Sequence, residues 1–174
     1  DHFALFATAF YNKNDSFSSV VGSTVGATAF KTRSVGIELD GSYSYGPFNF
    51  AVIATLQDAE ITASTTASDV GNRVLRQPKA QLRISPSYEM EIGNMTATVY
   101  GALQMVGNRY GDNGNTVELA SFEKLDAGIL FRTSSNLFFQ VHADNLTDSH
   151  GITEGDPRNP AAPNGRPILG RSVK

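Results

Sequence analysis

The sequence predicts an all-β fold, an antiparallel meander of about eight long strands that is part of a transmembrane β-barrel. Three observations predict it. Apolar and polar residues alternate over several segments, as in a strand whose two faces meet different surroundings. Short turn signals and long polar stretches alternate along the 174 residues. The alternating segments have roughly 10 to 13 residues each, whereas strands of soluble domains have about 5 to 6.

The first four strands are expected at residues 2–12, 35–45, 48–56 and 79–90. The first is apolar on both faces and alternates less clearly than the others. The fourth shows the pattern best, because its apolar residues occupy every second position: Ala80, Leu82, Ile84, Pro86, Tyr88 and Met90. The residues between them are polar, so a strand places them on the opposite face.

The remaining strands are expected at residues 95–105, 125–132, 137–144 and 168–174. The first three of these alternate like the fourth strand. The last has about seven residues, whereas a strand that crosses a membrane needs roughly 9 to 11. It also lacks a terminal aromatic residue. We therefore expect the chain to be cut before its last strand is complete.

The connections between these strands are alternately short and long. Short turn signals stand at residues 45–47, 93–94 and 134–136. Long polar stretches cover residues 13–30, 61–77, 108–121 and 148–167. Hairpins joined in this way place all the long loops at one end. Transmembrane barrels have this asymmetry, with short periplasmic turns and longer extracellular loops.

Strand length and aromatic position both fit a membrane. Ten residues tilted by about 45° rise about 23 Å, close to the apolar band of about 25 Å on outer-membrane barrels. Aromatic residues gather on the apolar faces beside the short turns, where barrels carry an aromatic girdle. They are Tyr43, Tyr45, Phe48, Phe50, Tyr88, Phe131 and Phe139.

Composition and charge exclude several classes of protein. The formal net charge is -3 and the pI is about 5.6, without the basic stripe of a nucleic-acid-binding protein. Cysteine is absent, which excludes disulfides and thiolate metal sites in this chain. No stretch reaches the roughly 18 apolar residues of a membrane-spanning helix. The mean hydropathy of -0.21 does not argue against a membrane barrel, because alternating strands average out.

Four weak motifs follow one another along this alternating background. They are TRSVGIELDG at residues 32–41, KLDAGI at 124–129 followed by NL at 136–137, NLTD at 145–148, and GRPILGRSV at 165–173. Together they resemble the C-terminal β-barrel region of TonB-dependent outer-membrane receptors over nearly the whole chain. The positions that the resemblance marks as structural are Arg33, Gly36, Glu38, Asn145, Leu146, Asp148, Gly165, Arg166, Gly170 and Arg171.

The resemblance implies a receptor and transporter in the bacterial outer membrane that takes up a scarce nutrient, such as an iron chelate, a cobalamin or a glycan. Residues 1–174 would then be a single segment, the C-terminal portion of a larger barrel, without the plug domain. The implied partners are outer-membrane lipid, an extracellular small-molecule cargo and TonB, which would act through an N-terminal region outside this segment. The segment would supply wall, lumen surface and outer loops.

No catalytic constellation stands out, so we expect no enzyme activity, no cofactor and no metal site. His142 shares a strand face with Gln140 and Asp144, and we interpret it as a polar residue that lines the lumen. Cargo contacts are expected from the long loops and the adjoining strand ends. The candidates are Arg73, Arg109, Tyr110 and Asp112, since Arg and aromatic residues are preferred at binding hot spots.

Two other interpretations stay open at this point. One is a self-contained eight-stranded outer-membrane barrel with a structural or adhesive role, since eight strands can close around a core of side chains. Its lumen would need a dense polar network, into which Ala51, Ile53 and Leu130 fit poorly. The other is a soluble β-barrel that carries a small ligand and turns its apolar face inward. An unclosed run of strands would leave two long edges that invite aggregation.

Overall fold

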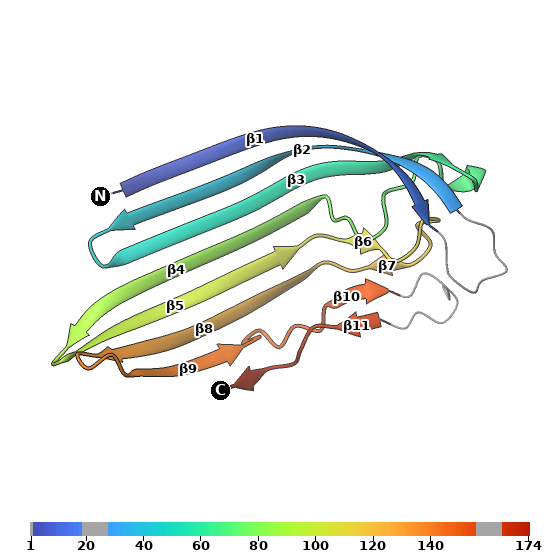
Figure 1. Ribbon diagram of the computed structural model, residues 1–174. Coiled ribbons are helices and arrows are strands. Elements are labelled where there is room, and N and C mark those ends of the chain that lie inside the picture. Colours follow the sequence, from blue (N-terminus) through green and yellow to red (C-terminus); the bar gives the residue numbers. More distant parts are fainter. Residues whose placement is uncertain (1, 19–27, 156–164) are drawn as a thin grey trace.

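The computed structural model describes residues 2–18, 28–155 and 165–174, most of which form one antiparallel sheet (Figure 1). Its eight strands follow the order β1-β2-β3-β4-β5-β8-β9-β12, so each strand pairs with the strand of this sheet that follows it in the chain. Their bounds are β1 His2–Ser18, β2 Thr28–Tyr45, β3 Phe48–Ser64, β4 Ala80–Ile92, β5 Met95–Val106, β8 Phe122–Thr133, β9 Phe138–Asp144 and β12 Ser172–Val173. The predicted antiparallel meander is confirmed.

Smaller elements fill the predicted long loops. They are the 3-10 helix η1 (Ala67–Asp69), the pair β6 (Arg109–Tyr110) and β7 (Glu118–Leu119), and the pair β10 (Ile152–Gly155) and β11 (Gly165–Pro167). All of them lie at the end of the sheet opposite the short turns (Figure 1). The predicted asymmetry of the connections is therefore confirmed. None of the helices in the described part of the chain is long and apolar enough to cross a membrane.

The first three strands extend farther than the alternation predicts. β1 and β2 stay paired as far as Ser18↔Thr28, although the sequence predicts a loop over residues 13–30. β3 continues to Ser64, past its expected end at residue 56. Backbone hydrogen bonds do not depend on side-chain polarity, so a ladder can continue where the alternation has ended. Residues 19–27 of the first predicted loop and 156–164 of the last lie outside the described residues.

The last strand is shorter than its predicted range of 168–174. β12 places Ser172 and Val173 opposite Asp144 and Ala143 of β9, and Lys174 continues the ladder through two backbone hydrogen bonds with His142 (2.9 and 3.0 Å). The residues before them are held elsewhere, because the carbonyl of Leu169 accepts a hydrogen bond from the Asn145 side chain (3.0 Å). A side-chain contact therefore replaces the ladder at the start of this segment.

The register brings residues of one kind together across the sheet. Tyr43 lies opposite Phe50, and Phe48 lies opposite both Tyr45 and Tyr88, so the aromatic residues of three strands meet beside the short turns. Phe131 and Phe139 pair in the same way between β8 and β9. The predicted aromatic band and the predicted apolar face are confirmed. The polar face is equally continuous, for example where Arg83, Gln104 and Lys124 follow one another from β4 to β8.

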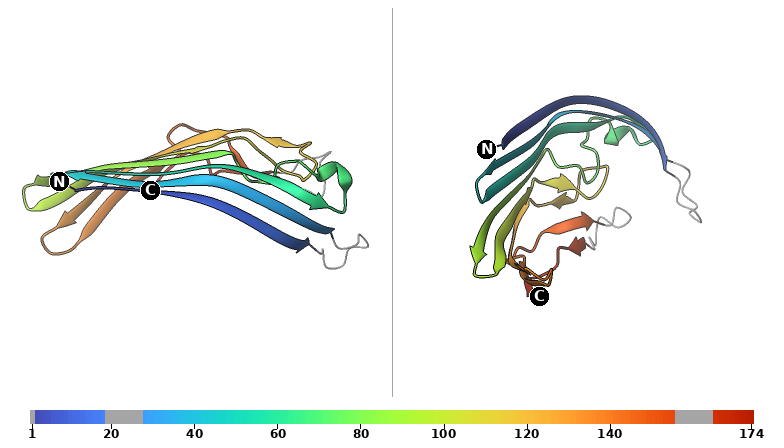
Figure 2. Two further views of the ribbon diagram at one scale, coloured as in Figure 1. Left: turned by 90° about the horizontal axis from the view of Figure 1, so that it is seen from above. Right: turned by 60° about the vertical axis from the view of Figure 1, so that its left-hand side comes forward.

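The sheet is curved and open. Figure 2 shows an arc, with β6, β7, β10 and β11 on its concave side. Arg109 of β6 and Gly151 beside β10 contact the ring of Phe122. Phe122 shares its row with Val106 and Gln81 on the polar face. The polar face is therefore concave and the apolar face convex. A soluble barrel would turn its apolar face inward, so that interpretation is wrong. A closed eight-stranded barrel is also wrong for the described residues, because β1 and β12 are opposite edges of the sheet and do not pair.

Candidate functional site

The segment between β3 and β4 packs back onto the outer end of β3. The backbone N–H of Ile61 donates to Asn72 (2.9 Å), that of Gly71 donates to Ile61 (2.8 Å), and that of Val74 donates to Ala59 (3.0 Å). Ala59 and Ile61 are buried beneath this segment. The contact fixes the position of Arg73, whose backbone bridges Glu60.

Two of the four predicted cargo contacts lie side by side. The guanidinium carbon of Arg73 stands 4.8 Å from the centre of the Tyr110 ring, a cation–π contact between the first outer segment and β6. Arg73 Nη1 also donates to the carbonyl of Asn108 (3.4 Å). Both side chains are partly exposed. They therefore present a cation and a hydroxyl-bearing ring at the outer end of the sheet.

Asp112 holds the turn between β6 and β7. Its carboxylate accepts hydrogen bonds from the backbone N–H groups of Thr116 (3.0 Å) and Val117 (2.8 Å), and from the Thr116 hydroxyl (2.9 Å). Burial alone would raise the pKa of Asp112, but these hydrogen bonds outweigh it and hold the pKa below its ordinary value. The carboxylate is therefore a structural acceptor in this state of the loop, and the side chain is buried.

Arg109 is buried as well, with 3% of its surface exposed. Its Nη2 donates to the carbonyl of Ile152 in β10, and its Nη1 donates to the carbonyl of Gly107 (3.4 Å). The guanidinium lies 5.3 Å from the centre of the Phe122 ring. Burial lowers the pKa of Arg109, because it disfavours the charged form. The four candidates thus gather in one region, and their part in cargo binding stays a prediction.

A hydrogen-bonded chain on the concave face was only partly predictable from the sequence. Tyr100 Oη lies 3.0 Å from His142 Nδ1, and His142 Nε2 lies 3.1 Å from Asp144 Oδ1. Lys174 Nζ donates to Asp144 Oδ2 (2.9 Å). Alternation places His142 and Asp144 on one face, but Tyr100 belongs to β5 and joins them across β8. A Cβ at Gly128 would overlap the Tyr100 hydroxyl, so this glycine makes room for the chain.

The first structural motif lies in β2. Arg33 forms an ion pair with Glu60 of β3 (Nη2–Oε1, 2.7 Å). A Cβ at Gly36 would lie 2.5 Å from both the Leu56 carbonyl oxygen and the Phe10 ring, so the Phe10 side chain needs this glycine. Glu38 stands on the polar face, opposite Thr8 and Thr55.

The motif at residues 145–148 forms a compact turn after β9. Asn145 is fully buried, and its Nδ2 donates to the carbonyls of Ser149 (2.9 Å) and Leu169 (3.0 Å). Its φ is +52°, and Asp148 has a φ of +51°, a region that Asn and Asp tolerate better than most residues. The backbone N–H of Leu146 returns to the Leu125 carbonyl (2.7 Å). The Asn145 side chain therefore fixes both the turn and the segment that contains Leu169.

The last motif lies in β11 and the segment that follows it. Gly165 sits against Ile152, where a Cβ would lie 2.5 Å from Ile152 Cγ2. Arg166 pairs with Glu154 of β10 (3.3 Å), and Arg171 pairs with Asp148 (3.9 Å). Gly170 has open space around its Cα, so packing does not require a glycine there.

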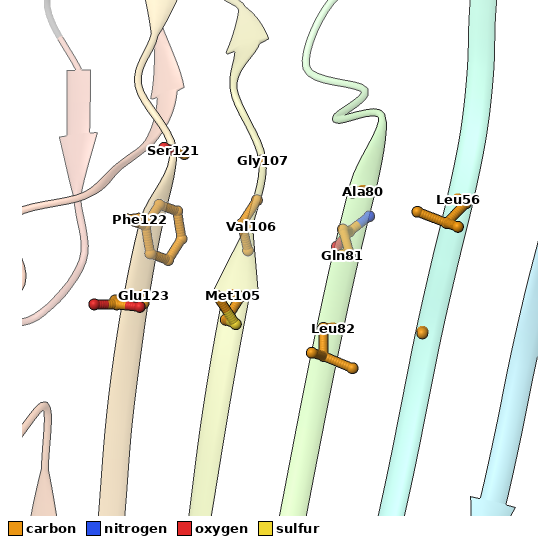
Figure 3. A pocket seen from close by; sticks show the side chains of 11 residues that line it. Leu56, Ala80, Gln81, Leu82, Met105, Val106, Gly107, Ser121, Phe122 and Glu123 are labelled. Carbon is orange, nitrogen blue, oxygen red and sulfur yellow. The ribbon is translucent and has the colours of Figure 1, made fainter.

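A shallow apolar hollow of about 620 Å³ lies on the convex side of the sheet (Figure 3). Its side chains on the apolar face include Leu56, Leu82 and Met105, with the small residues Ala80 and Gly107 between them. It lies on the apolar face, and the polar residues of its lining are Gln81, Ser121 and Glu123. Within residues 2–18, 28–155 and 165–174, no group of three or more His, Asp or Glu residues could hold a metal ion.

A convex apolar face with an aromatic band, a concave polar face and structured outer hairpins define this class of protein: it is a segment of a transmembrane β-barrel. The family model described as TonB dependent receptor-like, beta-barrel matches residues 1–146, and the chain belongs to this family. The predicted resemblance is confirmed.

Solved structures with the same fold include metal-chelate receptors. The ferric yersiniabactin uptake receptor FyuA from Yersinia pestis has a TM-score of 0.80 at 20% identity, over 98% of this chain and 26% of its own. The ferric preacinetobactin receptor BauA from Acinetobacter baumannii has a TM-score of 0.81 at 20% identity, over 98% of this chain and 26% of its own. The siderophore receptor PiuA from Acinetobacter baumannii has a TM-score of 0.79 at 21% identity, over 99% of this chain and 25% of its own. The chain thus spans about a quarter of each of these structures.

Proposed function

We propose that this chain is the C-terminal barrel portion of a TonB-dependent receptor that imports a metal chelate, of the ferric siderophore kind, across the bacterial outer membrane. Residues 1–174 supply wall, lumen surface and outer loops. A plug domain and the region that contacts TonB belong to the rest of the polypeptide. The convex face contacts outer-membrane lipid, and the transported cargo passes along the concave face.

One observation carries this proposal: the sheet joins a membrane-type wall to an outer end that folds into its own compact structure. The loops of a purely structural barrel need no such order. Here the contact of Arg73 with Tyr110 and the caps made by Asp112 build a defined surface beside the polar face. Defined polar surfaces are what a receptor needs for a small cargo, because ordering a loop on binding reduces affinity.

We divide the four predicted cargo residues into two pairs according to their exposure. Arg73 and Tyr110 are partly exposed and can touch a cargo directly. Arg109 and Asp112 are buried and act on the cargo through the position of the hairpin β6–β7. An Arg guanidinium and a Tyr hydroxyl both donate hydrogen bonds, so this surface favours a cargo with carboxylate, phenolate or hydroxamate oxygens.

The test uses the full-length receptor in cells that lack the chromosomal copy. Uptake of ferric catecholate, hydroxamate and carboxylate chelates is measured beside cobalamin and an oligosaccharide, with and without functional TonB. We expect TonB-dependent uptake of at least one ferric chelate. Uptake of cobalamin or the oligosaccharide alone would replace the proposed cargo, and the absence of TonB-dependent uptake for all of them would refute the transport function.

The proposed contacts are tested in the same cells. Arg73→Ala and Tyr110→Ala are each expected to raise the Kd for the transported chelate about tenfold or more, the scale of a binding hot spot. The matched control is Arg132→Ala, which removes an exposed arginine at the opposite end of the sheet. An unchanged Kd in both variants would remove these two residues from the cargo site.

A further inference from the structure

The three outer segments of this chain contact one another as well as the sheet. They are residues 65–79, the hairpin that contains β6 and β7 (residues 107–121), and the hairpin that contains β10 and β11. In Figure 1 they lie together at the end of the sheet opposite the short turns, although more than forty residues separate some of their contacts. The contacts between them decide whether they move separately.

The first and second segments are joined through one asparagine. Asn115 Oδ1 accepts from the backbone N–H of Arg73 (2.8 Å), and Asn115 Nδ2 donates to the carbonyl of the same residue (3.0 Å). The amide therefore pairs with Arg73 as a neighbouring strand would. Two further hydrogen bonds flank this pair: Asn72 Nδ2 donates to the Asn113 carbonyl (2.9 Å), and the N–H of Arg76 donates to the Tyr110 carbonyl (2.8 Å).

The second and third segments are joined through Arg109. Its guanidinium donates to the carbonyl of Ile152 in β10 and covers the ring of Phe122. Gly151 packs against the same ring so closely that a Cβ would overlap it. Arg109 is thus enclosed between the two hairpins and the sheet, where two carbonyls and the Phe122 ring stabilise its buried charge.

The first and third segments are joined by an ion pair. Arg76 Nη1 lies 2.5 Å from Glu154 Oε1, and the second oxygen of Glu154 lies 3.3 Å from Arg166 Nη1 in β11. The three segments therefore form a closed ring of contacts. Contiguous networks of packed side chains, hydrogen bonds and ion pairs carry energetic coupling between separate parts of a protein.

We infer that the three outer segments form one cooperative unit, and that Arg109 is the positioning residue that couples them. The inference concerning cargo rests on the proposed function, since a preformed unit would present Arg73 and Tyr110 in a fixed arrangement. Cargo then binds without ordering the loops first, which favours affinity. Arg109 itself contributes no contact with the cargo.

The test is hydrogen–deuterium exchange of the full-length receptor in lipid nanodiscs without cargo. Arg109→Met keeps the length of the side chain and removes its donors. We expect exchange to rise about tenfold or more in residues 107–121, in 65–79 and in 148–155, the scale of losing hydrogen bonds from a charged donor. The exchange rates of peptides from β4 and β5 should not change. The control Arg132→Met should leave all three outer segments unchanged.

A rise that is confined to residues 107–121 would overturn the inference, because the segments would then open independently. If Arg109→Met does not insert into the membrane, Asn115→Ala replaces it. Within the described residues, the hydrogen bonds of the Asn115 side chain go to Arg73 and Asp112 and none goes to β10 or β11. We expect its loss to raise exchange in residues 148–155 as well as in 65–79. Faster exchange in 65–79 alone would equally overturn the inference.

The Kd for the cargo is a second measurement, and it would not change if Arg109 only stabilised the fold. In the Arg109→Met receptor we expect a Kd at least about tenfold higher, with the uptake rate at saturating cargo unchanged per receptor in the membrane. Arg109→Lys, which keeps the charge and one donor, should restore part of the affinity. An unchanged Kd would remove the positioning role. A wild-type receptor that binds no chelate would refute the proposed function and leave the exchange result standing.

Discussion

The wall of the sheet and its outer end are stabilised in different ways. β5 pairs with β8 from Met95↔Thr133 to Val106↔Phe122 without a shift in register, and the same rows continue into β4 and β9. At the outer end, single side chains hold each piece: Asn115 replaces a strand, Asp112 caps a turn, and Arg109 joins two hairpins.

This difference determines which changes each region tolerates. Most positions of the wall need only a residue of the right polarity, because the backbone ladder forms with any side chain. Gly36 and Gly128 are exceptions, since a Cβ there would overlap Phe10 and Tyr100. The outer end needs particular donors and acceptors, since each one satisfies specific buried backbone groups. We therefore expect most wall positions to be more sensitive to polarity than to shape, and the outer end to be sensitive to single atoms.

The largest effect is expected for a charge on the convex face. Leu82 lies between Ala54 and Met105 in an apolar row, so Leu82→Lys should destabilise the barrel by roughly 2 to 4 kcal/mol, as for lysine near the bilayer centre. Gln81→Lys puts the same charge one residue away on the concave face and should cost less than about 1 kcal/mol. Urea unfolding in lipid vesicles measures both. Equal losses would contradict the assignment of the two faces.

The next effect is expected at Asn145, which belongs to the outer end although it follows β9. Asn145→Ala leaves the carbonyls of Ser149 and Leu169 without their donor and should cost about 2 kcal/mol. The control Asn136→Ala also removes an asparagine at positive φ, but from an exposed turn, and should cost about 0.5 kcal/mol or a little more. The same urea titration compares them, and similar losses would mean that backbone conformation alone explains Asn145.

The sequence could predict the wall because a strand has a strict period of two. Alternation alone assigns Phe131 and Phe139 to one face at the short-turn end, where the two residues pair. The concave-face chain shows the limit of this reasoning. Alternation places His142 and Asp144 on one face, but the contact with Tyr100 depends on the register of β5, β8 and β9. The register between neighbouring strands cannot be predicted from the alternation within a single strand.

The outer end could be predicted only as loops. Residues 108–121 have no period, so the sequence identified Arg109 and Asp112 by residue type and could not show that both are buried. Arg109 is covered because Ile152, more than forty residues later, accepts its hydrogen bond, and Gly151 packs against the Phe122 ring that the guanidinium covers. The resemblance marked Asn145 as structural, but its reach to Leu169 required the structure.

A smaller effect, confined to the outer end, is expected from a change of a single atom. Asn115→Asp keeps the size of the side chain and replaces the Nδ2 donor, so the hydrogen bond to the Arg73 carbonyl is lost. We expect a loss of about 1 kcal/mol within the outer end, seen as faster hydrogen exchange in residues 65–79 and, through the coupling of the segments, in 148–155. Asn113→Asp is the control, since Asn113 takes part through its backbone carbonyl. Equal exchange in the two variants would contradict the strand-like role of Asn115.

The smallest effect is expected from the protonation of Asp112. Its pKa in the folded hairpin is lower than the ordinary value of 3.8, so the ionised carboxylate stabilises the fold above that value. The stabilisation is lost as the pH falls through the folded-state pKa, and the turn between β6 and β7 should loosen only in that acidic window. Asp112→Asn should remove this dependence on pH, because an amide does not titrate.

A methyl-labelled Val117, whose backbone N–H donates to Asp112 (2.8 Å), reports this transition by NMR of the receptor in nanodiscs between pH 6 and 2. We expect a midpoint below 3.8 in the wild type and a flat profile in Asp112→Asn. A wild-type midpoint at or above 3.8 would mean that burial outweighs the hydrogen bonds from Thr116 and Val117. The hairpin would then bear an unfavourable charge, and its order would come from the contacts of Asn115 and Arg109 instead.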